Sequence, residues 1–324
     1  MTKPAVVDVH LTSDHAAKAL REDALAGLSD VPKWLPPKWF YDARGSELFE
    51  EITRLPEYYP TRAEREILRT HGADIAVQTS ARCLVELGSG SSEKTRLLLD
   101  ALTAHDSMAE FVPLDVSESA LRNAVDAIID DYPGLRVHGV VGDFTEHLDA
   151  LPGRSPRLVA FLGGTIGNLI PAERAQFFGS LRDVLDEGEW LLLGTDLVKA
   201  PDVLVRAYDD SAGVTAEFNR NVLRVLNREL GGDFDVDAFT HVARWNEEQE
   251  WIEMRLRAER EMAVHLHELG LDAHFEKGEE LGTEISAKFR REGVESELDA
   301  AGFALDSWWT DSEGRFALSL ARAA

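Results

Sequence analysis

The chain has 324 residues, a net charge of -25 at pH 7 and one cysteine. Such an acidic protein is a poor partner for nucleic acid or an anionic membrane, because both would repel it. One cysteine forms no intrachain disulfide, and no apolar run suits a membrane span or signal peptide, so we expect a cytoplasmic protein that acts on a small molecule.

The N-terminal section, residues 1–61, precedes the first clear α/β pattern. Its apolar spacing predicts a helix over residues 14–28. Proline- and aromatic-rich passages follow at 35–41 and 55–60, where proline lowers the entropic cost of a fixed conformation. Tyrosine hydroxyls in such passages suit a small polar ligand, although packing in a core explains the same aromatic residues equally well.

The segment 83–95 carries the most informative pattern in the chain. An apolar run containing Glu86 ends in a glycine turn with Gly88 and Gly90, and a helical pattern begins at Thr95. Glycine lets the backbone turn sharply and approach a ligand closely. The segment therefore predicts the first strand, loop and helix of a nucleotide-binding α/β domain.

Two phosphate-binding motifs resemble this loop but fit it less well. A P-loop requires glycine directly before its Lys-Thr pair, where Glu93 stands here, and a negative charge there would repel phosphate. The dinucleotide fingerprint requires glycine or alanine at the same place, so NAD is disfavoured but stays open. The loop suits S-adenosylmethionine (SAM), which carries a sulfonium and no phosphate.

Three further strands, predicted over residues 111–117, 136–144 and 157–168, end in polar residues that a parallel sheet would bring to one edge. Asp115 follows the glycine loop at the spacing of a ribose-binding carboxylate, although a capped turn also explains the residues after it. The predicted adenosine pocket is completed by Asp143 and Phe144. Asn168 is a substrate-contact candidate, and a left-handed turn explains an asparagine there as well.

A fifth strand is predicted over residues 190–196, and 306–320 reads as a hairpin of two strands. The interruption between them, residues 197–288, is too long for a loop. Helical spacing over 214–230 and alternation over 241–271 predict a lid or substrate module. The histidines at 265, 267 and 274 lack the companion ligands of a metal site, so we expect no metal.

Eight segments, in order and spanning nearly the whole chain, resemble the SAM-dependent histidine Nα-methyltransferases of ergothioneine biosynthesis; they are LPPKWFYD (35–42), LPEYYPT (55–61), ELGSG (86–90), FLG (161–163), IGN (166–168), AYD (207–209), FNRN (218–221) and TEIS (283–286). The resemblance implies an α/β fold. A class I (Rossmann-like), doubly wound methyltransferase domain would comprise residues 62–196 and 287–324, with a terminal β-hairpin. A second, substrate-binding domain would comprise the N-terminal section 1–61 and the insertion 197–286.

The resemblance further implies an enzyme that trimethylates the α-amine of free L-histidine to hercynine, with SAM as methyl donor and no metal. We expect a monomer that binds neither nucleic acid nor membrane. A nicotinamide-dependent oxidoreductase and a noncatalytic SAM-binding module remain the alternatives.

Residue roles also follow from the resemblance. The implied cofactor contacts are Gly88, Lys94, Asp115, Asp143 and Phe144. The implied substrate contacts are Tyr58, Gly163, Asn168, Tyr208, Met254, Glu284 and Ser286, with Tyr41 and Asn168 as the catalytic candidates beside the amine. Glu284 and Ser286 would bind the imidazole next to Met254, because a carboxylate and a hydroxyl can satisfy both ring nitrogens.

Overall fold

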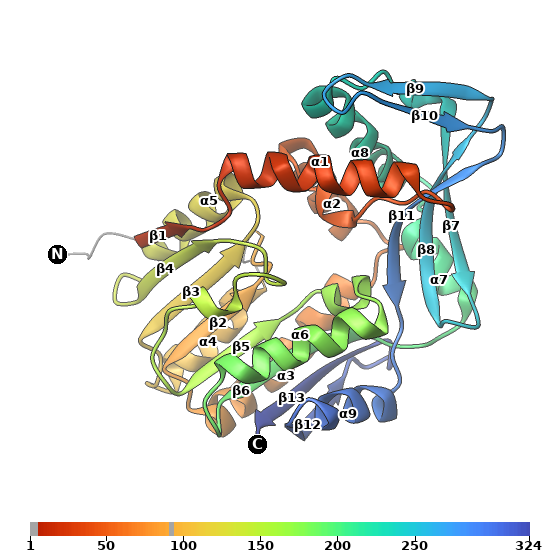
Figure 1. The fold of residues 1–324 in the computed structure, drawn as a ribbon. Helices are drawn as coiled ribbons and strands as arrows, with labels where there is room; N and C mark the ends of the chain where they lie inside the picture. The colour runs from red at the N-terminus through yellow and green to blue at the C-terminus, as the bar shows by residue number, and fades with distance from the viewer. Residues whose placement is uncertain (1–5, 91–93) are drawn as a thin grey trace. The chain divides into compact units, whose positions relative to one another are not determined.

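The computed structural model describes residues 6–90 and 94–324. Glu93, on which the comparison with phosphate loops depends, lies outside the described residues together with Ser91 and Ser92. The chain forms two compact units (Figure 1). Unit 1 contains the chain up to Leu11, Pro60–Val198 and Lys288–Ala324, and unit 2 contains Thr12–Tyr59 and Lys199–Ala287.

Unit 1 is built on an eight-stranded sheet of order β1-β4-β3-β2-β5-β6-β13-β12. The strands are β1 (Val6–Val9), β2 (Cys83–Leu87), β3 (Glu110–Asp115), β4 (Arg136–Val141), β5 (Arg157–Phe161), β6 (Trp190–Asp196), β12 (Phe303–Thr310) and β13 (Phe316–Ala323). Neighbouring strands are parallel, except that β13 runs antiparallel to both β6 and β12. This confirms the predicted doubly wound sheet with its terminal hairpin.

Helices cover both faces of this sheet (Figure 1): α3 (Pro60–Thr79), α4 (Thr95–Ala104), α5 (Glu118–Asp131), α6 (Pro171–Val184) and α9 (Arg291–Ala300). Ala160 of β5 belongs to the same core cluster as residues of α3, α4 and α5. The next residue, Phe161, points to the opposite face and contacts Phe177 of α6, with 4.9 Å between ring centroids. Burial on both faces explains why β2 is an unbroken buried run.

One part of the predicted N-terminal section differs from the structure. The sequence predicts that residues 1–61 belong together to the second domain, but β1 pairs in parallel with β4 and belongs to unit 1. Three of the four side chains of β1 are exposed. A short edge strand with so little burial leaves no hydrophobic pattern in the sequence.

Unit 2 combines helices with two small antiparallel sheets. The helical segments are α1 (Ser13–Ser29), η1 (Pro37–Phe40), α2 (Ala43–Thr53), α7 (Pro201–Tyr208), α8 (Val214–Leu230) and η4 (Val236–Ala238). One sheet has the order β11-β8-β7, with β7 (Phe239–Asn246), β8 (Trp251–Ala258) and β11 (Glu280–Ala287). The other is the hairpin of β9 (Met262–Leu266) and β10 (Leu271–Phe275).

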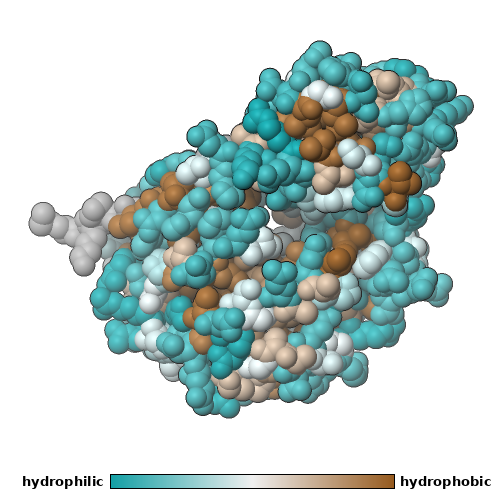
Figure 2. Space-filling view, in the orientation of Figure 1, coloured by the Kyte–Doolittle hydropathy of each residue, from teal (hydrophilic) through white to brown (hydrophobic). Residues whose placement is uncertain are grey.

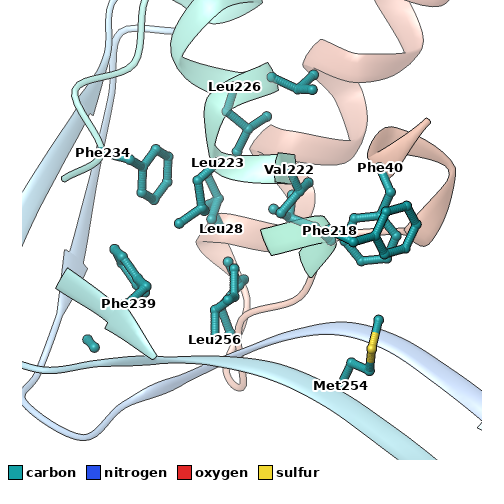
Figure 3. Close-up of a cluster of buried hydrophobic side chains, with 14 of the residues drawn as sticks. Leu28, Phe40, Phe218, Val222, Leu223, Leu226, Phe234, Phe239, Met254 and Leu256 are labelled. Carbon is teal, nitrogen blue, oxygen red and sulfur yellow. The ribbon is translucent and has the colours of Figure 1, made fainter. Parts of the chain in front are cut away.

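The core of unit 2 forms around α8, whose bounds agree with the predicted helix. Phe218, Val222 and Leu226 recur at helical spacing and are buried with Leu256 of β8. Figure 3 shows Met254 of β8 pointing from the sheet toward Phe218. Each fully buried side chain of this kind contributes about 1.5–3 kcal/mol. Outside the core, the face drawn in Figure 2 is mostly hydrophilic, in keeping with the net charge of -25.

Candidate functional site

The glycine loop of unit 1 is fastened to the end of the neighbouring strand β3. Gly88 (φ 69°) and Gly90 (φ 49°) both adopt left-handed backbone, which only glycine adopts without cost. The amides of Gly88 and Ser89 donate to the Leu114 carbonyl at 2.9 and 3.1 Å. The Gly90 amide donates to Oδ2 of Asp115 at 2.8 Å. The loop and the candidate ribose ligand therefore form one unit.

Asp115 retains capacity for a ligand. Its Oδ1 accepts the Ser117 amide at 2.9 Å, and each carboxylate oxygen can accept one more hydrogen bond. Burial raises the pKa of Asp115, although the hydrogen bonds that it accepts from backbone amides act to lower that pKa. Within the described residues, the buried Ser89 hydroxyl has no hydrogen-bond partner. An unsatisfied buried hydroxyl in this loop fits a polar ligand.

Asp143 and Phe144 follow β4, the strand beside β3. Oδ1 of Asp143 accepts the amide of Thr145 at 2.8 Å and its hydroxyl at 2.6 Å, which fixes the turn. The Phe144 ring packs against Phe161, with 4.9 Å between centroids. The structure thus places the predicted adenosine residues on adjacent strand ends of one sheet, where doubly wound folds bind ligands.

Sequence reasoning missed a residue that connects two predicted ones. Glu64 of α3 is fully buried; its carboxylate forms an ion pair with Lys94 and accepts the Gly163 amide at 2.7 Å. Asn168 ends the short helix η3 (Thr165–Asn168) after the same turn. An acid within the buried stripe of a helix is unusual. The placement of Glu64 among the apolar residues of α3 was the one sequence feature that could have indicated a special role for it.

In unit 2 the predicted substrate residues lie together. The Tyr208 hydroxyl is 2.7 Å from Oγ of Ser286, and the rings of Tyr208 and Tyr58 are 6.4 Å apart. Phe49 lies between Tyr58 and Tyr41, at 6.2 and 5.7 Å from their centroids. Tyr58 and Tyr208 are buried, whereas Tyr41 is 36% exposed. Hydroxyls are therefore gathered on an aromatic surface.

A β-bulge in β11 sets the direction of Glu284. Gly282 pairs with Arg255 and Glu284 with Met254, so Thr283 is an extra residue in the ladder. Without a bulge, alternation would place Glu284 on the same face as Glu280, whose carboxylate forms an ion pair with Arg257 at 2.8 Å. The extra residue moves Glu284 to the face of Met254.

The bulge is held by hydrogen bonds on both of its sides. The Thr283 hydroxyl is buried and donates to the carbonyl of Met254 at 2.9 Å. Gly282 donates to the Lys33 carbonyl at 3.0 Å and accepts the Leu35 amide at 2.8 Å. Ser286 pairs with the buried Ile252, on the same face as Glu284 and Met254. The three candidate imidazole contacts thus share one face of the sheet.

His241 of β7 supports the end of α7, where Tyr208 lies. Its Nε2 is 2.8 Å from the Tyr208 carbonyl oxygen, and its Nδ1 is 2.8 Å from Nδ2 of Asn219. An amide nitrogen donates and a carbonyl accepts, so this ring is neutral with its proton on Nε2. Burial lowers the pKa of His241 below its ordinary value of 6.5.

The protein is expected to lose stability as the pH falls below 6.5. The folded state keeps His241 neutral while the unfolded chain takes up a proton, so the free energy of unfolding becomes smaller as the pH falls in this range. The contribution is present above the ordinary pKa and disappears as the pH falls through the lowered one. Melting temperatures between about pH 8 and about pH 5 test this. A His241→Gln variant that declined in parallel with the wild type would contradict it.

The described residues contain no group of three or more His, Cys, Asp or Glu side chains that could hold a metal ion. In the same part of the chain, no helix is both long and apolar enough to cross a membrane.

A family model described as histidine-specific methyltransferase, SAM-dependent, matches residues 20–323. The chain belongs to this family. The histidine N-alpha-methyltransferase of Mycolicibacterium smegmatis is 58% identical over 96% of this chain and 97% of its own length. The enzyme of the same name from Mycobacterium tuberculosis is 57% identical over the same shares. The L-tryptophan methyltransferase trpM of Psilocybe serbica is 29% identical over 100% of this chain and 99% of its own.

This histidine-specific methyltransferase family is SAM-dependent, which decides between the cofactors left open by the glycine loop. The protein is thus a class I SAM methyltransferase, and SAM is its methyl donor. The nicotinamide alternative was wrong. The described residues of unit 1 fit SAM chemically, because the loop offers an unsatisfied Ser89 hydroxyl and Asp115 offers acceptors for ribose hydroxyls.

Proposed function

We propose that the protein transfers three methyl groups in succession from SAM to the α-amine of free L-histidine, giving hercynine, the first step of ergothioneine biosynthesis. The observation that carries this proposal is the common face of Glu284, Ser286 and Met254 in unit 2. The near full-length similarity to two histidine N-alpha-methyltransferases supports it.

Glu284 and Ser286 are proposed to bind the imidazole. The Glu284 carboxylate accepts the N–H of one ring nitrogen, and the Ser286 hydroxyl donates to the other. The hydrogen bond between Ser286 and Tyr208 fixes the position of that hydroxyl. A side chain without two ring nitrogens would leave this pair unsatisfied, which a binding site of this type discriminates against strongly.

The remaining contacts are proposed to bind the α-carboxylate and the amine. The Tyr58 hydroxyl and the Asn168 carboxamide are donors for a carboxylate. The Tyr208 hydroxyl then directs its proton to Ser286, so its oxygen, like the Gly163 carbonyl, can accept a hydrogen bond from the amine. Tyr41 and Asn168 are the catalytic candidates because they would orient the nitrogen lone pair. The proposed cofactor contacts are Gly88, Lys94, Asp115, Asp143 and Phe144.

Bound SAM supplies a methyl group on a positively charged sulfur, which makes that carbon electrophilic. The residues of this chain then have to orient the amine, keep it neutral for each attack and exclude water. Tyr208 and Ser286 supply fixed hydroxyls for the first task. The buried aromatic rings of Tyr58 and Tyr208 help to exclude water.

We further propose that the enzyme acts as a monomer in the cytoplasm. The only cysteine, Cys83, is buried, and burial raises its thiol pKa to about 12. Such a thiol is unreactive, and a chain with one cysteine forms no intrachain disulfide, which agrees with a reducing compartment.

Mass spectrometry of the purified protein with SAM and a mixture of the free amino acids tests the reaction. We expect histidine alone to gain three methyl groups. Methylation of tryptophan or another amino acid would overturn the roles of Glu284 and Ser286 and leave the family assignment intact. SAM binding without any methylation would favour the noncatalytic module.

A further inference from the structure

Glu64 is a fully buried charge of unit 1 that the proposed chemistry does not use. It lies in the first turns of α3, between Ala63 and Ile67 in the buried stripe of that helix. Its side chain has no exposed surface. A carboxylate is rarely buried so completely without a specific partner.

The Glu64 carboxylate has partners from two separate parts of the chain. One oxygen pairs with the Lys94 ammonium, directly before α4, and the other accepts the Gly163 amide at 2.7 Å. Gly194 leaves the space for it, because a Cβ at that position would overlap Oε1 of Glu64. The carboxylate therefore connects the end of the glycine-loop segment to the turn after β5.

The turn after β5 is held at both ends of one peptide group. The Gly163 amide donates to Glu64, while the Leu162 carbonyl accepts the Thr165 hydroxyl at 3.1 Å. Gly163 has a φ of 79°, so its backbone is turned sharply. With the peptide plane fixed, the direction of the following Gly163 carbonyl is also restricted.

We propose that Glu64 is a positioning residue that holds Lys94 and the Leu162–Gly163 peptide in the arrangement that binds SAM. Loss of the carboxylate would free the Lys94 side chain and loosen the turn together, because its two oxygens hold one each. The cofactor role of Lys94 belongs to the proposed function, and the coupling through Glu64 goes beyond it.

Calorimetry with SAM alone on Glu64→Gln in the full chain tests this proposal. Glutamine retains an acceptor for the Gly163 amide but not the charge that holds Lys94. We expect SAM to bind about tenfold to a hundredfold more weakly, with the circular dichroism spectrum unchanged. Wild-type affinity in this variant would overturn the proposal.

Glu297→Gln is the matched control, because it removes the acid that pairs with the buried Arg174 at 2.6 Å elsewhere in unit 1. A purely stabilising ion pair would affect both variants alike. SAM affinity is expected to stay at the wild-type value in Glu297→Gln. An equal loss of affinity in both variants would show that Glu64 acts only through stability.

A second measurement covers the case in which Glu64→Gln does not fold. Lys94 is partly exposed, with 22% of its side chain accessible, so Lys94→Met changes a less confined position. Amide hydrogen exchange at Gly163 in the SAM-free protein is expected to accelerate about tenfold or more in this variant. An unchanged rate would overturn the coupling. Neither measurement includes an amino acid, so a failure of the histidine assignment would be distinguishable.

Discussion

Glu284→Ala is expected to lower kcat/KM for histidine about a hundredfold or more while leaving SAM affinity unchanged. The substitution removes the charged acceptor proposed for one imidazole nitrogen and leaves that N–H without a partner. The measurement combines steady-state kinetics over a range of histidine concentrations with calorimetry for SAM. A loss of SAM affinity as large as the loss of histidine affinity would refute the assigned role.

Two further variants separate charge, shape and strand stability. Glu284→Gln keeps an acceptor oxygen without the charge, so we expect it to lie between alanine and the wild type. Glu280→Ala is the control for the strand, because Glu280 lies on β11 as well but pairs with Arg257 on the opposite face of the sheet. It should lower stability slightly and leave histidine kinetics intact. If Glu280→Ala lowered histidine use as strongly, the effect would belong to the strand and not to the site.

Asp115→Ala is expected to weaken SAM binding about a hundredfold, because it removes the acceptors proposed for the ribose and the anchor of the glycine loop. The Gly90 amide loses its partner at 2.8 Å in the same change. Calorimetry measures the affinity, and circular dichroism confirms that the fold is retained. An unchanged affinity would reject the ribose contact.

Asp131→Ala provides the comparison for Asp115. Asp131 lies at the end of α5 and pairs with Arg96 at 2.9 Å on the surface of unit 1. This variant removes an acid of the same unit whose partner lies in α4, outside the glycine turn at residues 88–90. SAM affinity should remain at the wild-type value in it, so a loss there would point to a general effect of charge.

Strand ends in unit 1 were predictable because two rules act on the same residues. A fully buried strand is a continuous apolar run, and its carboxyl end carries the ligand groups. The positions of Asp115 and Asp143 at strand ends could be predicted in this way. Glu64 could not be assigned, because it approaches Lys94 and the turn after β5 from a helix distant in sequence.

The candidate imidazole contacts in unit 2 could not be placed by residue parity. Strict alternation in β11 puts Ile285 on the inner face and both Glu284 and Ser286 on the outer one. The extra residue Thr283 reverses this, and its bulge depends on hydrogen bonds with Met254 and with the segment around Lys33. Such distant contacts leave no local pattern, so only the resemblance to a family indicated these residues.

The position of β13 constrains the order in which the protein can form during synthesis. Because β13 lies between β6 and β12, residues 190–196 find their second neighbour only in residues 316–322. All of unit 2 precedes residue 288. All residues of unit 2 therefore leave the ribosome before β13 does, at a stage when one edge of β6 is still unpaired. Until β13 emerges, that edge is open to other chains, and nascent-chain aggregation is the hazard that follows.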